Sequence, residues 1–237
     1  MKFALFGFGV MGHLVARLAA DQGDEVVVKL SSPSAERTLD ELTSALRGAD
    51  VAIDFSTAAA VRKNVAACVR AGIPLAEGTT GWHAQLDEVK KEVEQHNGAL
   101  IYGANFSAGV QVFYRIAKHA AQLFRALDTY DCFIEEMHHK RKRDAPSGTA
   151  LHLRQLVASH LEREVPVTST RAGYIPGTHR LGFDSNADQI LLSHVARNRE
   201  GFAAGALMAA RWIVGRRGVH EFSEVFEQIL QERKREL

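Results

Sequence analysis

A glycine-rich segment near the start of the chain, GFGVMG at residues 7–12, constrains the fold more than any other part of the sequence. The apolar run Lys2–Phe6 that precedes it has the character of a short buried strand, and apolar residues from Leu14 to Ala19 recur at helical spacing. A second strand-like run, Glu25–Leu30, follows. The segment therefore predicts a strand, a glycine turn, a helix and a strand, which together form one βαβ unit.

Three glycines in this context, after a strand and before a helix, are typical of a dinucleotide-binding turn. Gly7 would permit the tight turn, Gly9 would let a pyrophosphate approach the backbone, and Gly12 would let the helix pack closely on the strand. The N–H groups at the helix N-terminus would then bind the phosphates. The alternative is a glycine-rich turn in some other kind of α/β protein.

The end of the second predicted strand indicates which dinucleotide is preferred. Enzymes that prefer NAD usually place Asp or Glu there, to bind the ribose 2′-hydroxyl. This chain instead has Lys29, Ser31 and Ser32, with no acidic residue before Glu36. A 2′-phosphate would meet a lysine and hydroxyl groups without a repelling carboxylate, so we expect NADPH to be preferred and NADH to be possible. The alternative is that Lys29 is merely a solvated strand end.

Strand-like and helix-like segments continue to alternate as far as residue 106. Strands are expected at 51–55, 73–76 and 99–102, and helices at 58–71 and 85–96. This alternation predicts a parallel, doubly wound sheet of the Rossmann-like kind. Such sheets bind ligands at the carboxyl ends of their strands. Three loops of small residues fall there, at 54–57, 78–81 and 103–107, and we take them as candidate nicotinamide contacts, including Phe55, Ser56 and Thr79.

The pattern changes after Asn105, where a long amphipathic helix is expected at 110–127. A strand-like run at 130–137 and a helix at 149–161 follow, and later strands are expected at 165–171, 178–183, 188–197 and 201–206. The fold class is therefore α/β, an N-terminal Rossmann-like parallel sheet with a C-terminal α+β mixed-sheet domain. We expect a dinucleotide-binding domain at 1–106, a second domain at 107–207, and a helical segment at about 208–237 that packs back on the first domain.

Residues 135–150, EEMHHKRKRDAPSGTA, combine two histidines with a cluster of cations. The cations repel one another unless an anion or acidic side chains lie among them. His138 and His139 would point in opposite directions on an extended segment, and a histidine that titrates near neutrality can donate a proton. Lys142 offers a positive charge and a second proton donor. The segment therefore predicts a site for a negatively charged small molecule that is to be protonated.

The end of the same segment predicts a helix start. Pro146 favours extended backbone before it, so Ser147 is expected to be the N-cap. The N–H groups of Gly148 and Thr149 would then bind a carboxylate or a phosphate. The alternative is structural throughout: a solvated basic loop, a histidine with ordinary hydrogen bonds, and a serine that only caps its helix.

Composition excludes several other classes of function. The net charge is +1, so no global attraction to nucleic acid or membrane is expected, and no apolar run is long enough to span a bilayer. The basic loop has no interleaved aromatic residues for stacking on nucleic acid bases. Only Cys68 and Cys132 are present, which favours a reducing cytoplasm. Neither the cysteines nor the adjacent histidines have the spacing of a metal site, so no metal is expected.

The segment HHKRKRDAPSGTA closely resembles the signature of the dihydrodipicolinate reductase family. GFGVMG, GTTG, GANFSAGV and HVARNREGFAAGA resemble further segments of that family, so the resemblance extends along most of the chain. It implies NAD(P)H-dependent reduction of a cyclic dicarboxylate in the diaminopimelate route to lysine, with loss of a hydroxyl, hydride transfer and protonation of an enamine. It also implies that the second domain binds the substrate and assembles a homotetramer.

The resemblance also implies residue roles. His138 matches the general acid and Lys142 the lysine that helps to deliver the proton. Residues that match contacts to the substrate carboxylates are His139, Lys142, Ser147, Gly148 and Thr149. Arg199 matches a further such contact, because, of two nearby arginines, it stands at the better family position. Residues that match cofactor contacts are Gly7, Gly9, Met11 and Gly12 at the pyrophosphate, and Gly78, Thr80, Ala104, Asn105 and Phe106 beside the nicotinamide.

The sequence departs from the common family pattern at three places. The glycine turn is one residue shorter than in many members, and Val10 replaces a residue that is often basic. No acidic residue follows the second strand, which puts the use of NADH in doubt, and Arg141 stands where several members have histidine. Two other functions stay open: a related amino-acid-type dehydrogenase acting on another dicarboxylate, and a nucleotide-sensing or nucleic-acid-binding protein.

Overall fold

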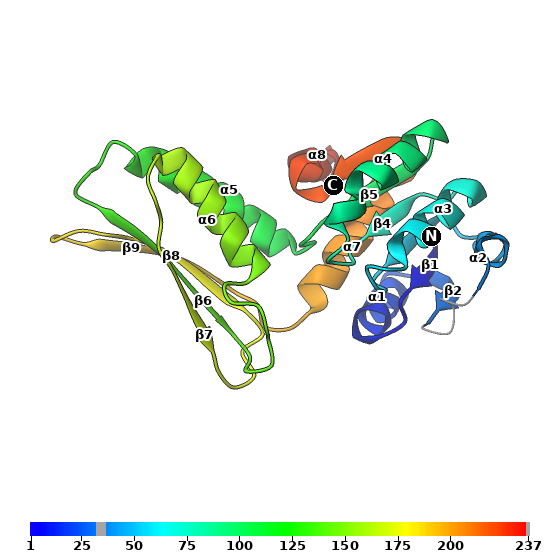
Figure 1. Ribbon diagram of the computed structural model, residues 1–237, viewed down its shortest axis with the longest axis horizontal. Coiled ribbons are helices and arrows are strands. Elements are labelled where there is room, and N and C mark those ends of the chain that lie inside the picture. Colours follow the sequence, from blue (N-terminus) through cyan, green and yellow to red (C-terminus); the bar gives the residue numbers. More distant parts are fainter. Residues whose placement is uncertain (32–36, 236–237) are drawn as a thin grey trace. The chain divides into compact units, whose positions relative to one another are not determined.

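The computed structural model describes residues 1–31 and 37–235, and the chain forms two compact units (Figure 1). Unit 1 consists of Met1–Ser107 and Glu200–Leu237, and unit 2 is the segment between them, Ala108–Arg199. Each unit has a sheet and a hydrophobic core of its own. Among the described residues, no helix is both long and apolar enough to cross a membrane.

Unit 1 is built on a parallel sheet of six strands. The order across the sheet is β10-β5-β4-β3-β1-β2, and every pair is parallel. The strands are β1 (Lys2–Phe6), β2 (Glu25–Leu30), β3 (Val51–Asp54), β4 (Leu75–Glu77), β5 (Ala99–Tyr102) and β10 (Gly218–Glu221). The chain leaves β1 toward β2 on one side and returns to β3 on the other, so the predicted Rossmann-like sheet is confirmed.

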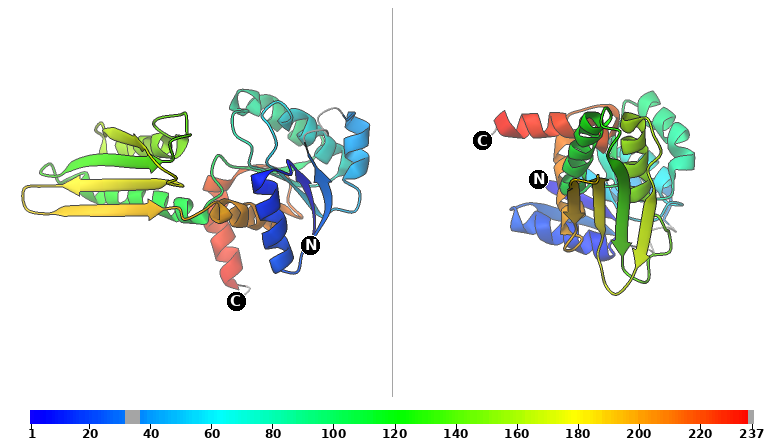
Figure 2. Two further views of the ribbon diagram at one scale, coloured as in Figure 1. Left: turned by 90° about the horizontal axis from the view of Figure 1, so that it is seen from below. Right: turned by 90° about the vertical axis from the view of Figure 1, so that its left-hand side faces the viewer.

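Helices cover both faces of this sheet (Figure 2). α1 (Val10–Asp21) packs against α7 (Glu200–Ile213) on one face, while α3 (Val61–Ala71) packs between α2 (Leu39–Ala45) and α4 (Leu86–Gln95) on the other. A short 3₁₀ turn, His83–Gln85, leads into α4, and α8 (Phe222–Arg235) follows β10. The central strands β3 and β5 are buried on both faces and are therefore mainly apolar rather than alternating, whereas the edge strands β2 and β10 are partly exposed.

Unit 2 is built on a mixed sheet of four strands with the order β7-β6-β8-β9. β6 (Asp131–His138) runs parallel to β7 (Val167–Arg171) and antiparallel to β8 (Thr178–Asp184), which pairs with β9 (Gln189–Val195). α5 (Ala108–Phe124) and α6 (Gly148–Leu161) lie side by side against the sheet. Phe124 of α5 stacks on Phe183 of β8, with ring centroids 4.1 Å apart. The predicted mixed sheet is confirmed.

The strand predicted at 201–206 is wrong, because these residues form the first turns of α7. In the sequence, the glycines of GFAAGA look like turns at the ends of a strand. In the structure, Gly205 allows α7 to pack closely. A Cβ atom on Gly205 would lie 1.6 Å from the carbonyl oxygen of Phe106, so only glycine lets α7 approach this loop. The sequence prediction also omitted α2 and β10, two short elements of seven and four residues.

Candidate active site

The glycine turn of unit 1 has two crowded positions and one open position. Gly7 has a φ of +81°, and a Cβ atom there would lie 2.2 Å from the carbonyl oxygen of Phe55. A Cβ on Gly12 would lie 2.3 Å from the carbonyl oxygen of Gly7. By contrast, a Cβ on Gly9 would meet none of the described residues within 4 Å. Gly7 and Gly12 are thus required by the fold, whereas Gly9 leaves its face open to a ligand.

Gly9 is also the N-cap of α1, so Met11 and Gly12 lie in the first turn of that helix. Within residues 1–31 and 37–235, no side chain forms a capping hydrogen bond at this end. The first N–H groups of a helix need partners from outside it, and a pyrophosphate is a suitable one. The arrangement therefore fits a dinucleotide in the way that the sequence predicts.

Lys29 lies at the carboxyl end of β2, beside the glycine turn. Its Nζ is 5.0 Å from the centroid of the Phe8 ring, and this ring also packs against His13 with centroids 4.2 Å apart. The Nδ1–H of His13 donates to the carbonyl oxygen of Gly9 over 2.8 Å. Ser31 is exposed just after Lys29, whereas Ser32 lies outside the described residues. Lys29 and Ser31 thus stay candidates for a 2′-phosphate contact, and His13 is an addition that the sequence did not suggest.

Two buried carboxyl groups hold the next two loops of unit 1. The backbone N–H of Ser56 donates to Asp54 Oδ1 over 2.7 Å, and the N–H of Thr79 donates to Glu77 Oε1 over 2.7 Å. Gly78 lies against the Phe55 ring, where a Cβ atom would approach to 2.3 Å. The predicted loops at 54–57 and 78–81 are therefore neighbours at the carboxyl edge of the sheet.

The third predicted loop lies after β5, next in the sheet. The N–H of Ser107 donates to Asn105 Oδ1 over 2.9 Å, and Phe106 is buried against Phe222, with ring centroids 4.8 Å apart. Ala104 and Thr80 are exposed at their loops. All three loops meet at one edge, but Phe106 is buried, its ring against Phe222 and its carbonyl oxygen against Gly205, so the structure does not expose it to a ligand.

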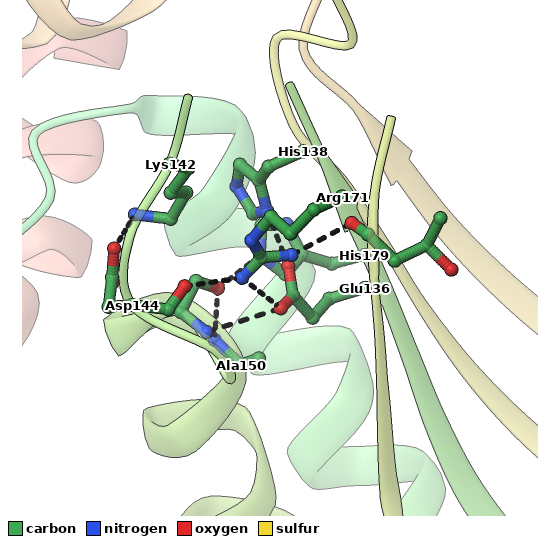
Figure 3. Close-up of polar contacts among 9 residues, drawn as sticks. Glu136, His138, Lys142, Asp144, Ala150, Arg171 and His179 are labelled. Carbon is green, nitrogen blue, oxygen red and sulfur yellow. Dashed lines mark hydrogen bonds and ion pairs between the residues drawn. The ribbon is translucent and has the colours of Figure 1, made fainter. Parts of the chain in front are cut away.

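The chemical groups of unit 2 centre on Glu136 and His138 of β6 (Figure 3). Both are buried, and they share one face of the strand because they are two residues apart. His138 Nδ1 forms a hydrogen bond with Glu136 Oε2. The other oxygen, Oε1, accepts from Arg171 Nη2 over 2.6 Å and from the N–H of Ser147 over 3.3 Å. One carboxylate thus joins the proposed acid to the start of α6.

Arg171 and Lys142 connect this carboxylate to the basic loop. Arg171 Nη2 also donates to the carbonyl oxygen of Asp144 over 2.5 Å. The carboxylate of Asp144 in turn forms an ion pair with Lys142 Nζ, at 2.8 Å. This contact with Lys142 holds the pKa of the Asp144 carboxyl below its usual value. The cations of the loop are therefore partly neutralised by acidic groups of unit 2.

Ser147 is the N-cap of α6, as predicted. It has extended backbone, with φ −67° and ψ 155°, and its Oγ accepts from the N–H of Ala150 over 3.2 Å. The same Oγ lies 3.2 Å from His179 Nε2. Gly148 is exposed, and a Cβ atom there would meet nothing within 4 Å. The N-terminus of α6 is thus open to an anion beside His138 and Lys142.

Burial sets the protonation states around the site. It lowers the pKa of His138, as do the nearby cations Lys142 and Arg171, while Glu136 opposes this change. Burial and the neighbouring His138 lower the pKa of His179 to about 4, so this ring is neutral at pH 7. Burial alone would raise the pKa of Glu136, but hydrogen bonds from Arg171, Ser169 and His138 outweigh it and keep the group ionised.

The structure brings together His138, Lys142 and Ser147, all of which the sequence singled out. His139 lies just past the end of β6 and is half-buried, with no protein partner for Nδ1 among the described residues. Arg199 is exposed and is the last residue of unit 2. The roles of these residues and of the loop positions in unit 1 stay predictions.

Sequence reasoning missed Glu136, Arg171 and His179. Glu136 could have been found, because strand alternation places it on the same face as His138. The other two come from distant strands: His138 pairs with Arg171, and Glu136 pairs with His179. That pairing is decided by the register of the sheet, which no local sequence pattern shows.

Atoms of Glu136, His138 and His179 lie within 4.8 Å of one another, a spacing that a metal ion could also occupy. However, the guanidinium of Arg171 binds the same carboxylate, and a cation there disfavours a second one. Hydrogen bonds to Ser147 and His138 already use the remaining polar atoms of Glu136. The guanidinium of Arg171 and the hydrogen bonds of Glu136 therefore make this cluster less suited to a metal ion than its spacing alone suggests.

Comparisons with known proteins agree along the chain. A family model described as dihydrodipicolinate reductase, N-terminus, matches residues 1–106, and one described as dihydrodipicolinate reductase, C-terminus, matches residues 109–226. The 4-hydroxy-tetrahydrodipicolinate reductase of Christiangramia forsetii is 32% identical over 98% of this chain and 100% of its own length. That of Haloarcula marismortui is 36% identical over 92% of this chain and 96% of its own length.

A solved structure supports the fold. The dipicolinate-bound dihydrodipicolinate reductase from Paenisporosarcina sp. TG-14 has a TM-score of 0.74 against this chain, with 21% identity. The similarity covers 95% of this chain and 99% of that one, so it includes both units.

Proposed function

This chain belongs to the dihydrodipicolinate reductase family, and we propose on that premise that it reduces 4-hydroxy-tetrahydrodipicolinate to tetrahydrodipicolinate. The reaction is a step of the diaminopimelate route of lysine biosynthesis. The observation that carries the proposal is the buried His138–Glu136 pair beside Lys142 and the open N-terminus of α6. It combines a proton donor with groups that bind carboxylates, which is what reduction of a cyclic dicarboxylate requires.

The residues of unit 2 bind and protonate the substrate. Lys142 and the N–H groups of Gly148 and Thr149 bind its carboxylates, with His139 and Arg199 as further contacts. His138 donates the proton to the enamine that is formed when the ring is reduced. Ser147 fixes the start of α6 and thereby the direction of its N–H groups.

The residues of unit 1 fit a nicotinamide dinucleotide, which supplies the hydride when bound. The support is the open face of Gly9 and the uncapped N-terminus of α1. NADPH is preferred over NADH, because Lys29 near the end of β2 and exposed Ser31 just after the strand stand in place of a carboxylate. Gly78, Thr80 and Asn105 bind the nicotinamide end from the loops at the carboxyl edge of the sheet.

The protein assembles as a homotetramer through unit 2 and works in the cytoplasm. Support for the assembly comes from β9, an edge strand that exposes Ile190, Leu191 and Val195. Exposed apolar side chains on a strand with one free edge favour association with another chain. Support for the cytoplasm comes from Cys68 and Cys132, which are both free and buried.

Oxidation of NADPH and NADH, followed at the nicotinamide absorbance with freshly formed dihydrodipicolinate synthase product, tests the proposed function. We expect rapid oxidation that is faster with NADPH and that is largely lost in Lys142→Ala. Lys140→Ala is the matched control, because Lys140 is an exposed cation of the same loop. If either coenzyme binds and no oxidation occurs, the dinucleotide site stands and the substrate is another dicarboxylate.

A further inference from the structure

Glu136 contacts both parts of the proposed site in unit 2. Its Oε2 binds the ring of His138, and its Oε1 accepts from the N–H of Ser147, which caps the helix that binds the substrate carboxylates. The side chain is buried, and Arg171 holds it from β7 at 2.6 Å. A single rigid carboxylate therefore sets the position of the acid relative to the start of α6.

The protonation state of Glu136 determines which ring nitrogen of His138 carries a hydrogen. An ionised carboxylate can only accept, so the Nδ1 of His138 must carry a hydrogen and donate it. The other nitrogen, Nε2, lies toward Gly177, where a Cβ atom would come within 3.1 Å. Glycine thus leaves space next to Nε2, the one ring nitrogen of His138 that Glu136 does not engage.

We propose that Glu136 is the positioning residue that makes Nε2 the proton-delivering atom of His138. Arg171 limits how strongly Glu136 stabilises the imidazolium. The proposal rests on the proposed function for the identity of the proton acceptor. In the step itself, the Nε2–H bond breaks and a C–H bond forms on the enamine carbon. The imidazolium then becomes a neutral ring with its hydrogen on Nδ1, still donated to Glu136.

Four charged or titratable groups from different elements face His138. Glu136 of β6 favours the imidazolium, whereas Arg171 of β7 and Lys142 of the basic loop disfavour it. His179 of β8 packs edge to face against the ring, with centroids 5.2 Å apart, and is neutral at pH 7. Because Glu136 and Arg171 act in opposite directions, their removal should have opposite effects.

Glu136→Gln should replace the hydrogen-bond acceptor that faces Nδ1 of His138 with a donor. The amide oxygen would keep the hydrogen bonds from Arg171 and Ser147, so its NH₂ group would face Nδ1. That group can donate only to a bare nitrogen, so the neutral ring would carry its hydrogen on Nε2 and the imidazolium would be disfavoured. We expect kcat at pH 7.5 to fall by roughly 10- to 100-fold, with little change in KM for the dicarboxylate.

Arg171→Met and Glu135→Gln complete the set of variants. Arg171→Met removes a competing cation and should raise the pKa of His138, whereas Glu136→Gln should lower it. Glu135→Gln is the matched control, because Glu135 is the adjacent carboxylate on the other face of β6 and pairs with Arg180 at 3.5 Å. It should leave both the pKa of His138 and the pH profile of kcat unchanged.

NMR of the enzyme without substrate gives a readout that is independent of activity. The ring signals of His138, assigned by their loss in His138→Gln, should report a neutral ring protonated at Nδ1 in the wild type. Their titration should move down in Glu136→Gln and up in Arg171→Met. A neutral wild-type ring protonated at Nε2, or shifts of the same sign in both variants, would overturn the proposal even if one variant folds poorly.

The two proposals can fail separately. If the expected titrations are seen but no dihydrodipicolinate synthase product is reduced, the proposed function is wrong and the role of Glu136 in orienting His138 stands. If the product is reduced but the tautomer and titrations differ from those expected, the enzyme stands and the positioning role is wrong.

Discussion

Asp54 and Glu77 occupy directly paired positions on β3 and β4, and both side chains are fully buried. Burial raises the pKa of each carboxyl, and for Glu77 the nearby Asp54 raises it further. Asp54 has hydrogen-bond donors in Ser56 and Asn64, whereas no described residue donates to Glu77 Oε2. Glu77 therefore keeps its proton at pH values where an exposed glutamic acid has lost it.

Glu77→Gln is expected to stabilise the protein at high pH. The unfolded chain loses the Glu77 proton near the ordinary pKa, while the folded chain retains it, so wild-type stability falls as pH rises above that value. Glutamine does not titrate and still accepts from the N–H of Thr79. Thermal unfolding at pH 8 should show a gain on the order of 1–3 kcal/mol, comparable to the cost of an unsatisfied buried group. The gain should shrink at pH 5; an equal gain at both values would exclude this explanation.

Gly9→Ala and Gly12→Ala should separate coenzyme binding from folding. An alanine at position 9 clashes with none of the described residues, so we expect only a small fall in Tm, because alanine is a poorer N-cap than glycine. NADPH binding should be at least about tenfold weaker, a loss of roughly 1.4 kcal/mol. An alanine at position 12 would lie 2.3 Å from the Gly7 carbonyl oxygen and should lower Tm. Calorimetry of unfolding and of NADPH binding measures both. Unchanged NADPH affinity in Gly9→Ala would remove that position from the binding site.

His138→Gln should lower kcat by roughly 10²–10⁴-fold, the usual contribution of a general acid. NADPH binding should stay nearly unchanged, since the residue belongs to unit 2 rather than to the dinucleotide-binding unit. The matched control is His119→Gln, an exposed histidine of α5. Steady-state kinetics measures the effect, and an undiminished kcat would remove His138 from the role of acid.

His179 should make the protein sensitive to mild acid. Its pKa is about 4 in the folded chain and 6.5 when unperturbed, so between these values only the unfolded chain takes up the proton. The titration of His179 should therefore lower stability as pH decreases from 6.5 to 4, by about 3 kcal/mol from this group. Urea unfolding over this range should show a shallower decline in His179→Gln, and the same decline as the wild type in His119→Gln. Parallel wild-type and His179→Gln curves would contradict this origin.

Local patterns predicted the frame of the fold and the centre of the site. β1 and β2 have the predicted bounds, because a short apolar run before a glycine turn has few alternative structures. Ser147 was found as an N-cap because the Pro146-Ser147-Gly148 sequence specifies a helix start locally. His138 and Lys142 were found because a short segment that combines adjacent histidines with a cluster of cations is unusual.

The residues that sequence analysis missed depend on long-range packing. Arg171 and His179 reach Glu136 only through the register of β6 with β7 and β8. The segment 201–206 looked like a strand between Gly-containing turns, while Gly205 in fact admits the Phe106 carbonyl against α7. In both cases the deciding partner lies far away in the sequence.

The chain leaves unit 1 after Ser107 and returns to it at Glu200, which determines the order of events during synthesis. The parallel sheet lacks β10 and its α7 cover until residues 200–221 have left the ribosome. Until then the edge of β5 is open to other strands. Unit 2, whose residues are contiguous, is complete earlier. Unit 1, whose first strands precede unit 2 in the sequence, can therefore finish folding only after unit 2 is complete, the reverse of the usual order for successive domains.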